Sequence, residues 1–122
     1  RKYMVKIIAD STCDLSDEII EKFNIDLLPL YIHMGDKEYK DRLEITPEDI
    51  FKWSDENSTT PKTSAPSIED AVEAIKPYKD NGDDVIVFAI SEDMSTCANV
   101  ARLAAEELEY EDHVFVILYR IQ

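Results

Sequence analysis

The hydrophobic positions of this chain fall into short uninterrupted runs that alternate with stretches of helical periodicity. Runs of this kind are typical of buried strands, and they predict strands at residues 5–9, 85–90 and 113–118. The expected helices have apolar side chains three to four positions apart or begin at a capping hydroxyl; they follow Ser16, Thr46, Ser67 and the segment 91–97. Strands that alternate with helices predict an α/β fold with a mainly parallel sheet covered by helices on both faces.

A smaller antiparallel element is expected between the first two helices. Residues 27–34 read as one strand interrupted by Pro29, and the turn residues Gly35-Asp36 lead into a second strand at 37–40. The proline favours an edge position for this hairpin. The hydroxyl-rich segment 57–67 is bounded by prolines and is expected to be a loop.

Length and charge narrow the classes of function. The 122 residues fit one domain, and 13 basic against 27 acidic residues give a net charge of −14. This charge opposes binding to nucleic acid or to an anionic membrane surface. The longest apolar run, 85–90, is far shorter than the roughly 20 residues of a transmembrane helix.

The cysteines and histidines indicate neither a disulfide framework nor a metal site. Cys13 and Cys97 are far apart in sequence, so reduced thiols in a cytoplasmic protein are expected. His33 and His113 lack the spacing of metal ligands, and we expect packed or surface side chains there. No cofactor is expected.

Hydroxyl side chains gather where expected strands end and helices begin. Ser11-Thr12 follows the first strand, Ser95-Thr96 follows the strand at 85–90, and Thr63-Ser64 precedes the helix that starts after Ser67. Helix starts offer unpaired N–H groups and partial positive charge, so such hydroxyls could hold a carboxylate or a phosphate. The same residues are also common as simple helix caps, and spacing alone leaves both interpretations open.

Four segments of the chain, residues 6–15, 28–30, 62–67 and 90–97, resemble the DegV family of bacterial fatty-acid-binding proteins. The Asp-Ser-Thr-Cys-Asp-Leu opening and the Lys-Thr-Ser-Ala-Pro-Ser segment carry most of the resemblance. It implies that residues 1–122 form the N-terminal α/β lobe of a two-lobed fold whose second lobe is absent. It further implies a carrier of one long-chain fatty acid, not an enzyme, that presents the acid to a separate ATP-binding fatty-acid kinase subunit.

The resemblance also implies which side chains meet the ligand. The family's carboxylate-binding threonine and serine correspond to Thr63 and Ser95. The expected crevice residues are Asp10, Ser11, Ser64 and Ser91. Hydroxyl groups can hold a carboxylate and leave one oxygen exposed for phosphoryl transfer, whereas burial of the tail would supply most of the affinity.

The chain departs from the family pattern in two places. Thr96 and Cys97 stand where the family has glycine and threonine, and the acidic pair Glu92-Asp93 lies close to the expected carboxylate, which it should disfavour. The chain also stops where family members continue into their second lobe. We therefore expect self-association through the face that the missing lobe would cover.

Two alternatives from other classes of function remain open. Asp10 ends a strand, as catalytic aspartates often do, so a small Asp-dependent hydrolase or phosphotransferase is possible. No glycine-rich phosphate loop supports that hypothesis. The other alternative is a plain interaction domain.

Overall fold

The computed structural model describes residues 4–11, 15–90 and 95–119 and is built around a four-stranded parallel sheet. The strand order is β2-β1-β6-β7, with β1 at Val5–Asp10, β2 at Asp26–Leu28, β6 at Asp84–Ile90 and β7 at Val114–Tyr119. Three of these strands are the predicted apolar runs. The α/β fold class and the parallel sheet are therefore confirmed.

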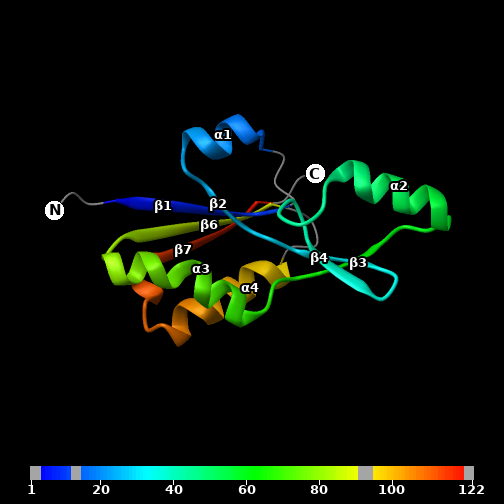
Figure 1. The fold of residues 1–122 in the computed structure, drawn as a ribbon. Helices are drawn as coiled ribbons and strands as arrows, with labels where there is room; N and C mark the ends of the chain where they lie inside the picture. Colours follow the sequence, from blue (N-terminus) through cyan, green and yellow to red (C-terminus); the bar gives the residue numbers. More distant parts are fainter. Residues whose placement is uncertain (1–3, 12–14, 91–94, 120–122) are drawn as a thin grey trace.

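Helices lie on both sides of this sheet (Figure 1). On one side are α3 (Ile68–Asn81) and α4 (Ser95–Glu107), and on the other is the short α1 (Asp17–Lys22). The hydrophobic core lies between the sheet and the α3–α4 pair. It is formed by Ile8, Leu28, Ala71, Ile75, Val85, Val87, Cys97, Ala101, Ala104, Ala105 and Val114.

Local capping explains where the helices begin. Thr46 starts α2 (Pro47–Asn57) and exchanges hydrogen bonds with Asp49, and Ser67 does the same with Asp70 at the start of α3. Such capping boxes satisfy backbone N–H groups that a helix start leaves without partners. A left-handed Gly82 ends α3, which continues through Pro77. A short 3-10 helix, Glu111–His113, precedes β7.

The expected antiparallel hairpin belongs to a second, three-stranded sheet. Its order is β4-β3-β5, with β3 at Tyr31–Met34, β4 at Lys37–Lys40 and β5 at Lys62–Ser64. Gly35 makes the tight turn between β3 and β4 with a φ of 68°. In Figure 1 this sheet extends past the carboxyl ends of the parallel strands.

Three local predictions were wrong. Residues 27–34 form two strands in different sheets, because the chain leaves the main sheet at Pro29, which has no N–H to donate. The segment 57–67 is not all loop, since the backbone of β5 pairs with β3. The loop expected at 91–97 ends earlier, because α4 already begins at Ser95.

The sheet face opposite α3 and α4 is only partly covered. We call it the open face and define it by Ile7, Ile86, Phe88, Phe115 and Ile117, which lie in register across β1, β6 and β7. Phe115 is 50% exposed and Ile117 is 42% exposed, whereas Ile7, Ile86 and Phe88 are half-buried. Among the five residues that define the open face, the most exposed thus belong to β7, the edge strand of this sheet farthest from β2.

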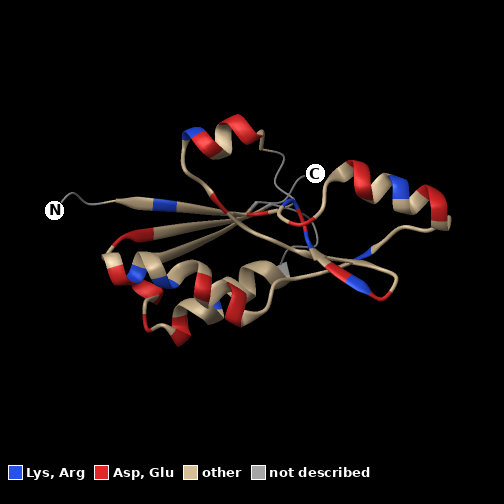
Figure 2. Ribbon diagram, in the orientation of Figure 1, with Lys and Arg blue, Asp and Glu red and all other residues tan. Residues whose placement is uncertain are grey.

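Acidic side chains are concentrated on helices and turns. Figure 2 shows the red segments mainly on α1, α2, α3 and α4, while the middle of the parallel sheet is largely uncharged. The repulsion expected from a net charge of −14 therefore acts mainly at the helical surface and spares the open face.

Candidate ligand-binding site

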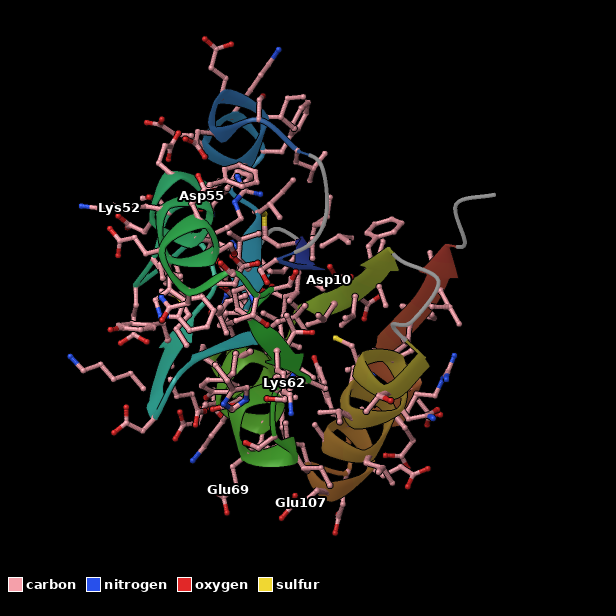
Figure 3. All side chains as sticks on the ribbon, turned by 90° about the vertical axis from the view of Figure 1, so that its right-hand side faces the viewer. Asp10, Lys52, Asp55, Lys62, Glu69 and Glu107 are labelled. Atoms are coloured by element: carbon pink, nitrogen blue, oxygen red, sulfur yellow. The ribbon has the colours of Figure 1, made fainter. Side chains whose placement is uncertain are left out.

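The carboxyl ends of β1 and β6 bring the predicted site segments to one end of the molecule. Figure 3 looks onto this end, with Asp10 at the tip of β1, with β5 at Lys62 and with the start of α4 facing the viewer. Loops and helix starts at this edge are where parallel α/β sheets usually bind ligands. The fold thus gathers the two segments that carry Thr63 and Ser95 at the same edge.

Asp10 and Ser11 are held inside the protein at this edge. Asp10 is fully buried, and Ser11 is 3% exposed. The Ser11 hydroxyl oxygen accepts a hydrogen bond of 3.0 Å from the Leu30 N–H, and the Ser11 N–H donates to the Leu28 carbonyl at 3.2 Å. Ser11 therefore ties the end of β1 to the crossing between the two sheets.

Buried Cys97 lies in the first turn of α4, on the side that faces the core. Burial and then the charge of Asp10 raise the pKa of the Cys97 thiol to about 11. The influence of Asp10 places the tip of β1 beside the start of α4. A thiol in this environment is neutral and packs as a small apolar side chain.

Thr63 and Ser64 point to opposite faces of the small sheet. Thr63 pairs with Ile32, whereas Ser64 pairs with Tyr31, and side chains of successive strand residues alternate between faces. Both are exposed. The two hydroxyls that were expected as neighbours in one crevice therefore do not share a face.

Two side chains of β3 hold the segment that follows Thr63. His33 Nε2 lies 2.8 Å from the Ser64 Oγ, and the Tyr31 hydroxyl donates to Asp70 Oδ2 at 2.8 Å. Asp70 Oδ2 also accepts the Ser67 N–H at 3.0 Å. Burial opposes the charge of Asp70, but the bonds from Ser67 and Tyr31 outweigh it and hold the pKa of this carboxyl below its ordinary value.

The remaining expected site residues are only partly described. Ser91 and the acidic pair Glu92-Asp93 lie outside the described residues, as does the side chain of Ser95. Ser95 is the first residue of the 13-residue α4, and Thr96 is exposed in the same turn. The first N–H groups of a helix have no partner within the helix, so this turn has donors for an anion.

A cavity of about 560 Å³ lies next to Ser11, which directly follows β1. It is lined by Ser11, Leu15, Asp17, Asp41, Arg42, Ile45, Thr46, Pro47 and Glu48. Arg42 Nη2 is already bonded to the Leu15 carbonyl and to Asp17 Oδ1, each at 3.1 Å. The cavity is also lined by the carboxylates of Asp17, Asp41 and Glu48. Because like charges repel, it is poorly suited to a fatty-acid carboxylate.

Sequence reasoning missed the partners that hold the site segment. Tyr31 and His33 were assigned only to a strand, and their contacts with the segment 64–70 depend on the strand β5 that was expected to be a loop. Arg42 was also missed; its positive φ of 67° and its place at the cavity had no sequence signal that we recognised.

The described part of the chain has neither a candidate metal site nor a candidate membrane-spanning helix. Within residues 4–11, 15–90 and 95–119, no three His, Cys, Asp or Glu side chains are grouped so that they could hold a metal ion. Over the same ranges, no helix combines the length and the apolar character that crossing a bilayer requires.

Comparison with known proteins gives consistent matches. The model of the DegV family, described as uncharacterised, matches residues 4–117. A DegV domain-containing protein of Clostridium perfringens is 40% identical over 112 residues, which cover 92% of this chain and 40% of the relative. A fatty acid-binding protein of Thermotoga maritima is 37% identical over 115 residues, covering 90% of this chain and 39% of the relative.

Solved structures match the fold as well. A stearic acid-binding protein of Eubacterium ventriosum superimposes with a TM-score of 0.82 at 32% identity, over 93% of this chain and 41% of its own. A DegV family protein of Thermus thermophilus, described as binding fatty acid, gives 0.79 at 32% identity, over 93% and 40%. The chain therefore spans about two fifths of the length of these relatives.

Proposed function

This chain belongs to the DegV family, and from that membership we propose that it is part of a carrier that binds one long-chain fatty acid. The observation that carries the proposal is the match to a stearic acid-binding structure at a TM-score of 0.82, over 93% of this chain. The likeness to the fatty acid-binding protein of Thermotoga maritima supports the same ligand class. In this proposal residues 1–122 are the N-terminal lobe, and a second lobe completes the tail site.

The headgroup is proposed to bind between Thr63 and Ser95. Thr63 is exposed on β5, on the face of the small sheet away from Ser64, and Ser95 opens a helix whose first N–H groups need partners. Both segments belong to the same edge of the molecule (Figure 3). Neutral donors suit a chain of this charge, because they hold a carboxylate locally against an overall acidic field.

The role proposed for the protein is presentation of the acid, not catalysis. A separate ATP-binding kinase subunit would phosphorylate the carboxylate oxygen that the hydroxyls leave exposed. The hydrolase alternative required Asp10 as a nucleophile or base, and the full burial of Asp10 disfavours that role. A location in the cytoplasm is proposed with it, supported by the neutral buried thiol of Cys97.

Self-association is proposed for the 122-residue chain when it stands alone, with a second copy of the chain covering the open face. Phe115 and Ile117 support this choice, since they are half exposed on an uncharged apolar surface. The sheet face is thus the favoured contact surface.

The ligand class can be tested by native mass spectrometry of the purified protein. The expected result is a co-purified fatty acid that is retained under gentle conditions and lost in organic solvent. Thr63→Ala with Ser95→Ala should reduce phosphorylation of the bound acid more than binding of its tail. Purification of ligand-free protein only, followed by no uptake of added oleic acid, would rule the carrier out.

A further inference from the structure

Two side chains on one face of β3 fix the segment that carries Thr63. Tyr31 and His33 are two residues apart, so both point to the same face of the small sheet. His33 reaches Ser64, and Tyr31 reaches Asp70 in the first turn of α3. Thr63 directly precedes Ser64 in sequence, but its side chain points to the opposite face.

β5 needs such support because its own pairing is small. It has three residues, all exposed, and within the described chain its strand partner is β3. After Ser64 the chain passes through buried Pro66 to the cap residue Ser67. The bond from Tyr31 to Asp70 links β3 to the end of this segment, because Asp70 also accepts the Ser67 N–H.

The Tyr31–Asp70 bond is stronger than an ordinary contact between neutral groups. Its acceptor is a carboxylate that the hydrogen bonds keep charged, and a phenol that donates to a charged oxygen makes a charge-assisted bond. The bond, burial and the charge of Asp70 raise the pKa of the Tyr31 hydroxyl to about 12. The donor therefore stays protonated at any physiological pH.

We infer that Tyr31 is a positioning residue for Thr63: through Asp70 it fixes the segment 62–67 so that the Thr63 hydroxyl is held ready on the opposite face. The inference rests on the proposed function, in which Thr63 binds the carboxylate. It gives the residues of the Lys-Thr-Ser-Ala-Pro-Ser motif separate tasks. Thr63 meets the ligand, Ser64 binds His33, and Ser67 caps α3.

The contact between Ser64 and His33 fits this role better than a catalytic one. A histidine that accepts a proton from serine can activate the hydroxyl, provided that a third group orients the imidazole. Here Glu38 Oε2 is 4.0 Å from His33 Nδ1, beyond hydrogen-bond distance, and both side chains are more than one third exposed. The pair is therefore assigned to holding β5.

The test compares a fatty acid with the alcohol of the same tail, for example oleic acid with oleyl alcohol. The ratio of the two dissociation constants reports on the headgroup contacts and cancels the contribution of the tail. Thr63→Ala should reduce the preference for the acid about tenfold, as expected for a bond to a charged group. Tyr31→Phe should reduce it about three- to tenfold, and the double variant should lose no more than Thr63→Ala alone.

Tyr110→Phe is the matched control. The Tyr110 hydroxyl donates to the Asp83 carbonyl at the opposite, amino end of β6, so this variant also loses one tyrosine hydrogen bond. It should leave the preference for the acid unchanged. Equal weakening of acid and alcohol by Tyr31→Phe would show a merely structural role and overturn the inference.

Amide hydrogen exchange of the ligand-free protein separates the inference from the proposed function. Tyr31→Phe should speed exchange across residues 62–70 at least about fivefold, whereas Tyr110→Phe should not. Unchanged exchange in Tyr31→Phe would overturn the positioning role. If Thr63→Ala kept the full preference for the acid while exchange changed as expected, the headgroup assignment would fail and the support of β5 by Tyr31 would stand.

Discussion

The carboxylate of Asp10 raises the pKa of the Cys97 thiol, although the two residues belong to β1 and α4 and are 87 positions apart in sequence. Both are fully buried. Their proximity fixes how the first turn of α4 meets the tip of β1. On the side of the core, the neutral Cys97 thiol therefore packs against the edge of the sheet that carries the proposed headgroup site.

Alkylation kinetics should report this environment. With its pKa at about 11, the Cys97 thiol carries about 100-fold less thiolate at pH 8 than a thiol with a pKa of 9.0, so it should react slowly with iodoacetamide. Asp10→Asn should speed the reaction only in part, because burial is the larger cause. The measurement uses a Cys13→Ser background, so that Cys97 alone is labelled. Rapid labelling of folded protein at pH 8 would contradict the buried placement.

A second prediction concerns a polar network between β1, β2 and α3. The Lys6 ammonium lies 3.1 Å from Asp26 Oδ1 with only 9% of its side chain exposed, and it also donates to the Asn24 carbonyl. The Tyr78 hydroxyl donates to Asp26 as well. Asp26→Ala leaves a buried cation without its charged partner and should lower the free energy of unfolding by about 1–3 kcal/mol.

The control for this network is another ion pair of the same length. Asp17 Oδ1 is also 3.1 Å from its cation, Arg42, but 99% of the Asp17 side chain is exposed. Asp17→Ala should change the free energy of unfolding by less than about 0.5 kcal/mol in urea denaturation. If Asp26→Ala and Asp17→Ala lowered the free energy of unfolding equally, the burial of Lys6 would not explain the stability that its ion pair contributes.

The parts of the fold that follow from local chemistry were predictable. The capping pairs at Thr46 and Ser67 fixed the starts of two helices, and the run 85–90 marked the central strand β6. The short strand β5 was not predictable, because its residues are polar and its partner β3 lies about 30 positions earlier. Pairing over that distance is decided by tertiary structure and overrides local preference.

The same missed strand limited the prediction of the site. A loop leaves the directions of its side chains open, so Thr63 and Ser64 were expected in one crevice. In a strand, neighbouring side chains must diverge, and Ser64 turns to His33. The burial of Asp10 likewise follows from its place between β2 and β6, which the order of elements along the chain does not give.

Acid unfolding should show the contribution of Asp70. The hydrogen bonds from Ser67 and Tyr31 hold the pKa of Asp70 in the folded protein below its ordinary value. The charged carboxylate therefore stabilises the fold at a pH above the ordinary pKa, and this contribution is lost as the pH falls through the lower pKa of the folded state. Asp70→Asn should therefore cost about 1 kcal/mol at pH 6, and the difference from the unsubstituted protein should shrink toward pH 2. Urea denaturation over this pH range measures the difference in the free energy of unfolding.

Glu69→Gln, in the same turn as Asp70 but exposed, is the control. A difference that stayed constant with pH would show that the charge of Asp70 is not what stabilises the start of α3.

The open face yields a prediction about assembly of the isolated chain. Because Phe115 is half exposed on an uncharged apolar surface, Phe115→Glu should shift the 122-residue chain from dimer to monomer in sedimentation velocity over a concentration series. Its circular dichroism spectrum should not change, since the substituted side chain is not part of the core between the sheet and the α3–α4 pair. Phe51→Glu is the matched control, as Phe51 is even more exposed, at 70%, but lies on α2. A chain that is already monomeric, or that Phe51→Glu dissociates equally well, would show that the open face does not hold two copies together.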